Sequence, residues 1–313
     1  MKKIILLLFI SAIVAQVSAQ QDHQYTQFMY NKLPNNPAYA GSRGVPTMTA
    51  IFRSQWIGFE GAPQSFLASV HSPFLSKRVG VGVSISHQKS GLQRDFLGSL
   101  AYSYDLVSSK SMSLRVGVMG AVRSFAIDFT EAKPGQPGDP SLDNQQVNQI
   151  LGNVGAGLYA TFNDRFYVGL SAPRIYQNKI GINPNANAIL ARESRHYYAM
   201  AGIILPVGDD INLMPAFLVK YVENAPIDAD INLNLDIRQK FTAGLSYRLG
   251  GDGPGDSVDL LAFWQASPQM GIGVAYDFSL SALKDYTAGS IELLFQADLK
   301  KRKRNMSNPR FFL

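Results

Sequence analysis

The stretch at residues 226–236, PIDADINLNLD, decides the fold class of this chain. Apolar residues occupy every second position from Ile227 to Leu235, and polar residues occupy the positions between them. A period of two is that of a β-strand, whose successive side chains point to opposite faces, whereas a helix needs apolar residues three or four apart. The stretch therefore predicts a strand with one apolar and one polar face.

The same alternation recurs along most of the chain after residue 45. Its runs are close to the roughly 9–11 residues of a tilted membrane strand. Dividing the chain by this pattern gives fourteen candidate strands, near residues 45–55, 65–72, 78–88, 95–106, 111–124, 152–163, 165–172, 195–205, 210–221, 226–236, 237–249, 257–266, 269–279 and 287–298. An even strand number with an apolar face on every strand is typical of bacterial outer-membrane barrels. We therefore predict an all-β fold, a transmembrane antiparallel β-barrel of about 14 strands.

Loop lengths give a second test of this prediction. Outer-membrane barrels join their strands by short turns on the periplasmic side and by longer loops outside. The predicted connections alternate in this way, and the two longest, residues 125–151 and 173–194, fall on the same side. This parity places the N- and C-termini in the periplasm. A soluble β-sandwich or barrel also has one apolar face per strand, but its small interior could hardly accommodate the apolar faces of so many strands.

The first residues have the pattern of an export signal. Lys2 and Lys3 precede an apolar stretch at residues 4–14, and Val17 and Ala19 supply the small side chains before a cleavage site. The apolar stretch is shorter than the roughly 20 residues of a membrane-spanning helix. We therefore predict a signal peptide cleaved near Ala19 and a multi-pass β-barrel in the outer membrane.

Composition and charge exclude several classes of function. The chain has no cysteine, so it has no disulfide framework, no cysteine nucleophile and no thiolate metal site. Its net charge of +6 lies at the two ends, because the chain without Lys2, Lys3 and the basic residues after position 299 has 21 basic and 23 acidic residues. A near-neutral body does not form the basic surface that nucleic acids require, so we expect no nucleic-acid partner.

A search for catalytic and metal-binding patterns finds only weak candidates. The four histidines have no metal-ligand spacing, and no G-x-S-x-G nucleophile motif occurs. An outer-membrane hydrolase that pairs His87 with Ser84 or Ser86 is a poor candidate. The acidic residues of the loop at 128–144 could bind calcium, although a solvated loop is the preferred interpretation. We expect no enzyme activity, no catalytic residues, no cofactor and no metal.

The two ends of the mature chain are its unusual parts. Residues 20–44 are rich in aromatic and amide side chains, and residues 300–313 form a basic tail that ends in Phe311-Phe312-Leu313. Small residues at predicted inward positions leave room in the lumen for a loop, for the N-terminal segment or for a solvent channel. We therefore divide the chain into a signal peptide at 1–19, a periplasmic or plug-like segment at 20–44, a barrel at 45–299 and the tail, which is a docking segment or an assembly signal.

Four blocks of sequence are similar to one known family. They are QYTQFMYN at 24–31, NPAYAG at 36–41, FRSQWIGFEGAP at 52–63 and PRFF at 309–312. In these blocks the chain resembles the PorP/SprF family of type IX secretion-system membrane proteins. The first three blocks lie within forty residues and in the family's order, whereas the rest of the chain matches chiefly in length and strand pattern.

The resemblance implies a non-enzymatic component of the secretion or gliding machinery. Such a protein would bind periplasmic machine components, anchor exported adhesins that carry a C-terminal sorting domain, or both. The loop that begins at Trp56 would face outside, and the segment at 20–44 and the tail would meet periplasmic partners. The candidate partner-binding residues are Tyr25, Phe28, Tyr30, Tyr39, Arg53, Trp56, Phe59, Arg310, Phe311 and Phe312. The alternative is an outer-membrane channel or transporter for small or hydrophobic solutes.

Overall fold

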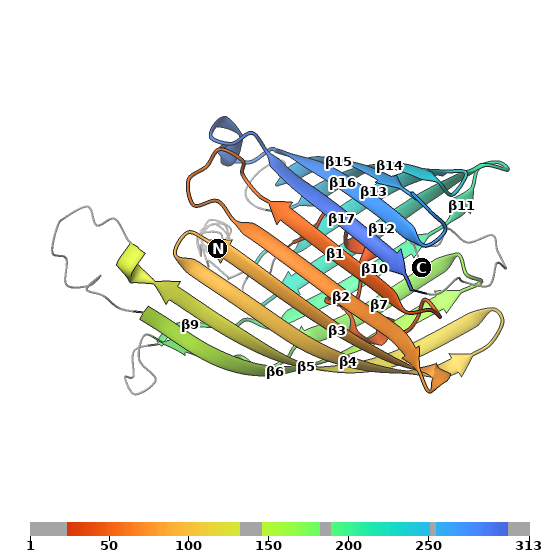
Figure 1. Ribbon diagram of the computed structural model, residues 1–313, viewed down its shortest axis with the longest axis horizontal. Helices are drawn as coiled ribbons and strands as arrows, with labels where there is room; N and C mark the ends of the chain where they lie inside the picture. Colours follow the sequence, from red (N-terminus) through yellow and green to blue (C-terminus); the bar gives the residue numbers. More distant parts are fainter. Residues whose placement is uncertain (1–23, 132–145, 182–188, 224, 251–254, 300–313) are drawn as a thin grey trace, which may run out of the picture.

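Fourteen antiparallel strands close into a β-barrel in the computed structural model, which describes residues 24–131, 146–181, 189–223, 225–250 and 255–299 (Figure 1). The barrel strands are β1 (Thr47–Ser54), β2 (Gln64–Phe74), β3 (Ser76–Ser90), β4 (Gln93–Ser108), β5 (Met112–Asp128), β6 (Gln146–Phe162), β7 (Phe166–Arg174), β10 (His196–Ile203), β12 (Ile211–Val222), β13 (Asp228–Ile237), β14 (Phe241–Leu249), β15 (Ser257–Trp264), β16 (Met270–Ser279) and β17 (Ser290–Asp298). Neighbours in sequence are neighbours in the sheet, and pairing of β1 with β17 closes the ring. The predicted fold class is confirmed.

The alternating strand faces have the orientation that a membrane barrel requires. In β13, Ile231 and Leu233 point outward and are 42% and 46% exposed, whereas Asp230 and Asn232 point into the lumen and are 1% and 0% exposed. Apolar side chains therefore cover the outside, and polar side chains fill the inside. None of the helices in the described residues has the length and apolar character to span a bilayer.

The structure corrects the prediction for the two longest loops. Strand β5 continues to Asp128 and β6 begins at Gln146, so residues 125–128 and 146–151 are strand and not loop. Two short strands, β8 (Lys179–Gly181) and β9 (Ile189–Arg192), pair with each other inside the predicted loop at 173–194, and β11 (Leu205–Pro206) pairs with β12. An apolar cluster of Phe125, Val147, Leu151 and Ile180 joins these extensions. Such contacts link distant segments, so no local pattern predicts them.

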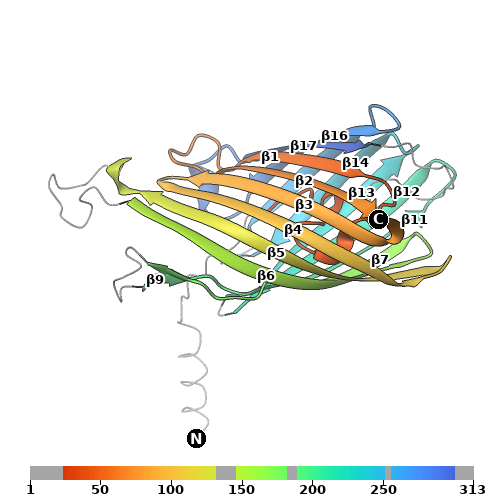
Figure 2. The ribbon, with the colours of Figure 1, turned by 60° about the horizontal axis from the view of Figure 1, so that its bottom comes forward.

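The two ends of the barrel differ in their connections. At the short-turn end, β2 and β3, β4 and β5, β6 and β7, and β13 and β14 are joined by a few residues each. Asn163 and Asp164 between β6 and β7 have φ angles of 50° and 51°, values that hairpin turns need and that Asn and Asp tolerate well. The long-loop end carries the connections from β5 to β6 and from β7 to β10 (Figure 2). The orientation with the short-turn end and both termini in the periplasm stays a prediction.

Residues 24–44, which we call the plug, lie inside the barrel (red in Figure 1). The plug contains two single-turn 3₁₀ helices, η1 (Phe28–Tyr30) and η2 (Pro37–Tyr39), whose residues are all buried. It runs from the long-loop end, where Gln24 meets Asp228 at the start of β13, to the short-turn end, where Arg43 meets Asp298 at the end of β17. The predicted signal peptide and basic tail lie outside the described residues, and the predicted domain boundaries stay predictions.

Glycines on the inner wall make the space that the plug occupies. A Cβ atom at Gly117 would lie 2.3 Å from the backbone nitrogen of Ala38, and one at Gly80 would lie 2.0 Å from the carbonyl oxygen of Ala40. Real Cβ atoms do not approach other heavy atoms so closely, because such distances lie well inside van der Waals contact. Small inward residues therefore leave room for the N-terminal segment, one of the three possibilities that the sequence left open.

Candidate functional site

A buried network of charges anchors the first part of the plug. The carboxylate of Glu292 on β17 accepts hydrogen bonds from the backbone N–H groups of Thr26 (2.9 Å) and Gln27 (3.0 Å). The guanidinium of Arg53 on β1 pairs with Glu292 at 3.1 Å and with Asp277 on β16, and it donates to the hydroxyl of Thr26 at 3.1 Å. These three charged side chains are at most 2% exposed, so their mutual pairing offsets the large cost of removing them from water.

A second group of charges continues the network around the lumen. Asp230 on β13 accepts from Lys220 on β12 at 2.6 Å and from Arg248 on β14 at 2.8 Å. Next to it, the carboxylate of Asp228 accepts a hydrogen bond from the side chain of Gln24, the first described residue of the plug. Six strands, β1, β12, β13, β14, β16 and β17, and the plug are therefore tied together through polar side chains that point into the lumen.

The second part of the plug is held by hydrogen bonds to β2, β4 and β5. The backbone N–H of Gly41 donates to Nδ1 of His71 at 3.1 Å, and the carbonyl oxygen of Ala40 accepts from Ser103 at 2.6 Å and from Arg115 at 3.0 Å. These bonds satisfy backbone groups that would otherwise be buried without a partner.

Lys32 is the most deeply buried cation of the plug. Its ammonium group donates to the carbonyl oxygen of Met29 at 2.7 Å and lies 4.5 Å from the ring centre of Tyr167. Burial lowers the pKa of Lys32 well below its usual value, and the positive charge of Arg43 lowers this pKa further. The aromatic ring faces compensate part of the lost hydration.

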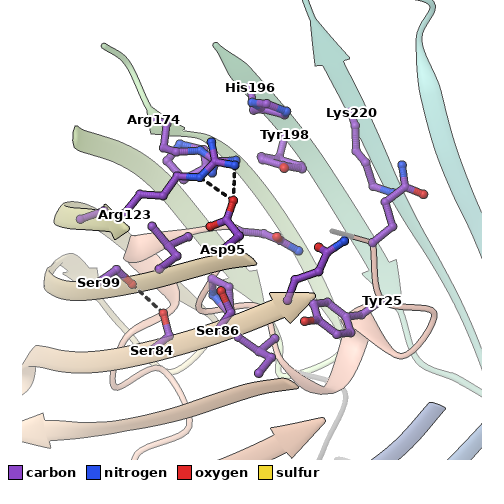
Figure 3. A pocket seen from close by; sticks show the side chains of 18 of the residues that line it. Tyr25, Ser84, Ser86, Asp95, Ser99, Arg123, Arg174, His196, Tyr198 and Lys220 are labelled. Atoms are coloured by element: carbon purple, nitrogen blue, oxygen red, sulfur yellow. Dashed lines mark hydrogen bonds and ion pairs between the residues drawn. The ribbon is translucent and has the colours of Figure 1, made fainter. Parts of the chain in front are cut away.

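A cavity of about 280 Å³ remains beside the plug, toward the long-loop end of the lumen (Figure 3). Tyr25 of the plug lies on one side of it, and His196 and Tyr198 of β10 lie on the other. Its wall on β3 and β4 carries the short side chains of Ser84, Ser86 and Ser99, and the hydroxyls of Ser84 and Ser99 are 2.6 Å apart. Burial raises the pKa of Tyr25 to about 12, so its hydroxyl remains protonated at neutral pH.

Comparison with known families gives the chain its assignment. The family model described as type IX secretion system membrane protein PorP/SprF matches residues 17–296. The chain belongs to the PorP/SprF family. No curated protein sequence matches the chain as a relative.

Solved structures with a similar fold are also outer-membrane barrels or transporters by their names. The outer membrane protein Omp33 of Acinetobacter baumannii has a TM-score of 0.49 and 8% identity, and the match covers 81% of this chain and 97% of that one. A Pseudomonas aeruginosa FadL homologue has a TM-score of 0.48 and 14% identity, with 85% and 93% covered. The Ralstonia pickettii toluene transporter TbuX has a TM-score of 0.48 and 11% identity, with 88% and 94% covered.

The structure places the family blocks at the plug and at its anchor. The block at 24–31 contains Tyr25, which lines the cavity, and Phe28 and Tyr30, which are buried in the lumen. The block at 36–41 contains Tyr39, which is 1% exposed, and the block at 52–63 contains Arg53 of the buried network. Two of the four family blocks therefore form part of the plug, and a third contains one of its anchors.

Trp56 and Phe59 lie apart from these residues, in the loop between β1 and β2 at the long-loop end. Phe59 is 47% exposed, and the loop is fixed to the chain before β17 by two backbone hydrogen bonds of 2.8 Å that join Ile57 to Ala288 and Gly289. Arg310, Phe311 and Phe312 lie outside the described residues. The role of all ten candidate residues in partner binding stays a prediction.

The structure also shows site residues that the sequence did not single out. Asp277, Glu292, Arg248 and Asp230 belong to the buried network, and their only signal in the sequence is a charge on the polar face of a strand. Conversely, the weak hydrolase candidate is not assembled, because His87 is exposed on the outer face while Ser84 and Ser86 face the lumen. The described residues contain no group of three or more His, Asp or Glu side chains suited to a metal ion, and most of the loop at 128–144 lies outside them.

Proposed function

We propose that this protein is a non-enzymatic outer-membrane component of the type IX secretion and gliding machinery that binds other machine components, anchors exported adhesins, or does both. Membership of the PorP/SprF family supports the machinery. The observation that carries the binding role is the plug, which is fixed in the lumen by buried ion pairs and by close contacts with inward glycines. A lumen filled in this way favours a fixed scaffold whose two ends meet partners, and it disfavours an open channel for solutes.

Each end of the barrel offers an apolar side chain for a partner. Phe59 is 47% exposed at the long-loop end, and Leu75, between β2 and β3, is 93% exposed at the short-turn end. Each has an exposed apolar neighbour, Ile57 (37%) beside Phe59 and Phe74 (51%) beside Leu75, and contiguous exposed apolar groups mark surfaces that bind other proteins. In the predicted orientation, Phe59 would meet an exported adhesin and Leu75 would meet a periplasmic component.

The test is affinity isolation of tagged full-length protein from native membranes. Recovery of an exported protein through its C-terminal domain supports anchoring, and recovery of periplasmic components supports a role as a machine part. Phe59→Asp should reduce recovery of the exported protein only, and Leu75→Asp should reduce recovery of the periplasmic components only, so each variant is the control for the other. Finding no partner in either class, together with solute flux through the wild-type protein in liposomes, would replace this proposal by the transporter alternative.

A further inference from the structure

The luminal cavity exists because the plug does not fill the barrel evenly. The first part of the plug is tied by Glu292 and Arg53 to the wall of β1, β16 and β17, and the wall that begins two strands beyond β1, at β3, β4 and β5, carries short side chains such as Ser86, Ser99 and Ala121. The floor of the cavity is formed by residues that are at most 7% exposed: Asn31, Ile51, Leu67 and Met119. The cavity is therefore closed toward the short-turn end, and a ligand must enter from the long-loop end.

The charged side chains at the cavity lie beside charges of opposite sign. Arg123 pairs with Asp95 and, at 2.9 Å, with Glu193, and Arg174, which also lines the cavity, interacts electrostatically with the same Glu193. Lys220 pairs with Asp230 at 2.6 Å and lies 3.7 Å from Asp228. A ligand with a net charge would have to break these pairs or enter without a counter-charge, and both are costly in a buried site.

Uncharged polar side chains form much of the remaining cavity wall. Ser84, Ser86 and Ser99 contribute hydroxyl groups, and Asn31 and Gln88 contribute amides. The amide oxygen of Asn31 already accepts from Ser69 at 2.8 Å, so the orientation of this amide is fixed. Hydroxyl and amide groups can both donate and accept, so this wall suits a ligand or solvent that also does both.

These features select the class of ligand. A cavity that is closed at one end admits a polypeptide chiefly by a chain end, and a free chain end carries a charge that the balanced wall does not match. Sugar hydroxyls are uncharged, and each one both donates and accepts. Tyr25 and Tyr198 add amphipathic rings at the sides of the cavity. We propose that this cavity is a binding site for a neutral saccharide of one or two rings, a size in keeping with its volume of about 280 Å³.

The test is calorimetric titration of the purified full-length protein in detergent with maltose and with N-acetylglucosamine. Tri-alanine, which has charged ends, serves as the peptide probe. We expect saturable binding of at least one sugar and none of tri-alanine. Ala121→Phe, which fills the cavity, should weaken sugar binding at least tenfold, and Gln88→Leu, which removes an amide of similar size, should weaken it severalfold. Ser124→Phe is the matched control on the same strand, because Ser124 faces outward and is exposed, and it should bind as the wild type does.

Three results would overturn the proposal: no saturable binding of either sugar, binding of tri-alanine in their place, or sugar binding that Ala121→Phe leaves unchanged. The unfolding midpoint of each variant shows whether its barrel has formed. Because Gln88→Leu removes no buried contact of the plug, it keeps the test open if Ala121→Phe does not fold. No partner protein enters this experiment, so the proposal fails or holds independently of the proposed secretion role.

Discussion

Replacing Gly117 by alanine should release the plug while the barrel remains folded. A Cβ at this position would lie 2.3 Å from the nitrogen of Ala38 and 2.5 Å from the carbonyl carbon of Pro37. Both atoms belong to the backbone of η2, so no flexible side-chain end can turn away. Overpacking a filled interior costs about 1–3 kcal/mol, which corresponds to a rise of about 5- to 150-fold in the equilibrium constant for plug opening.

Hydrogen exchange measured by mass spectrometry on the protein in detergent gives this equilibrium constant directly. Amides of residues 24–44 in Gly117→Ala should exchange about 5- to 150-fold faster than in the wild type, while amides of the strands keep their protection. Gly120→Ala is the matched control, because Gly120 is three residues further along β5, faces outward and has no atom within 4 Å of its Cβ position. Gly80→Ala tests the same idea at a second contact, with the carbonyl oxygen of Ala40 at 2.0 Å.

The result that would refute this reasoning is unchanged plug exchange in Gly117→Ala and Gly80→Ala with intact barrels. It would mean that the inner glycines do not set the distance between wall and plug. Equal acceleration in Gly117→Ala and Gly120→Ala would point to a general loosening of β5 instead.

Three further predictions concern the contacts that hold the plug. Arg53→Ala leaves two buried carboxylates without their main counter-charge and should lower the free energy of unfolding, measured with urea, by about 3–5 kcal/mol. The control Arg238→Ala breaks a pair whose arginine is 71% exposed and should cost under about 1 kcal/mol. Equal urea midpoints for the two variants would contradict the role of burial. Asn36→Ala removes the acceptor of the Ala38 N–H (3.0 Å) and the donor to the carbonyl oxygen of Leu158 (2.8 Å). The free energy of plug opening, measured by hydrogen exchange, should therefore fall by about 1–3 kcal/mol. An unchanged value would argue against both hydrogen bonds as supports of the plug. Burial lowers the pKa of Lys32 well below its usual value, so the docked plug binds fewer protons than the released plug in the pH range between that lowered pKa and the ordinary lysine value of 10.5. Plug protection factors should therefore rise with pH as it approaches 10.5 from below in the wild type, and should rise less in Lys32→Met. An equal rise in both proteins would exclude Lys32 as the cause.

Much of the barrel could be predicted because its strands carry a local pattern. The run at 226–236 becomes β13 at Asp228–Ile237, shifted by two residues at one end and one at the other. The strand ends at residues 125–128 and 146–151 were missed because they are stabilised by contacts with Ile180, which lies on a separate short strand. Local alternation cannot report such a contact.

The site was predictable only in part. Aromatic density marked residues 20–44 as unusual, and small inward residues indicated free space in the lumen, yet neither feature showed that one fills the other. Arg53 was a candidate because it belongs to one of the family blocks. Its partners Asp277 and Glu292 lie 224 and 239 residues away along the chain, and in the sequence they resemble any other residue on the polar face of a strand.

The sequence by itself determined that this chain is a membrane barrel, because a two-residue period fixes which side chains of each strand share a face. The pairing of charges, the course of the plug and the cavity beside it were decided only by tertiary structure. The physical reason is that the lumen exists only after β1 meets β17: closure brings distant polar faces together, removes them from water and makes each of them depend on a partner that the sequence does not place nearby.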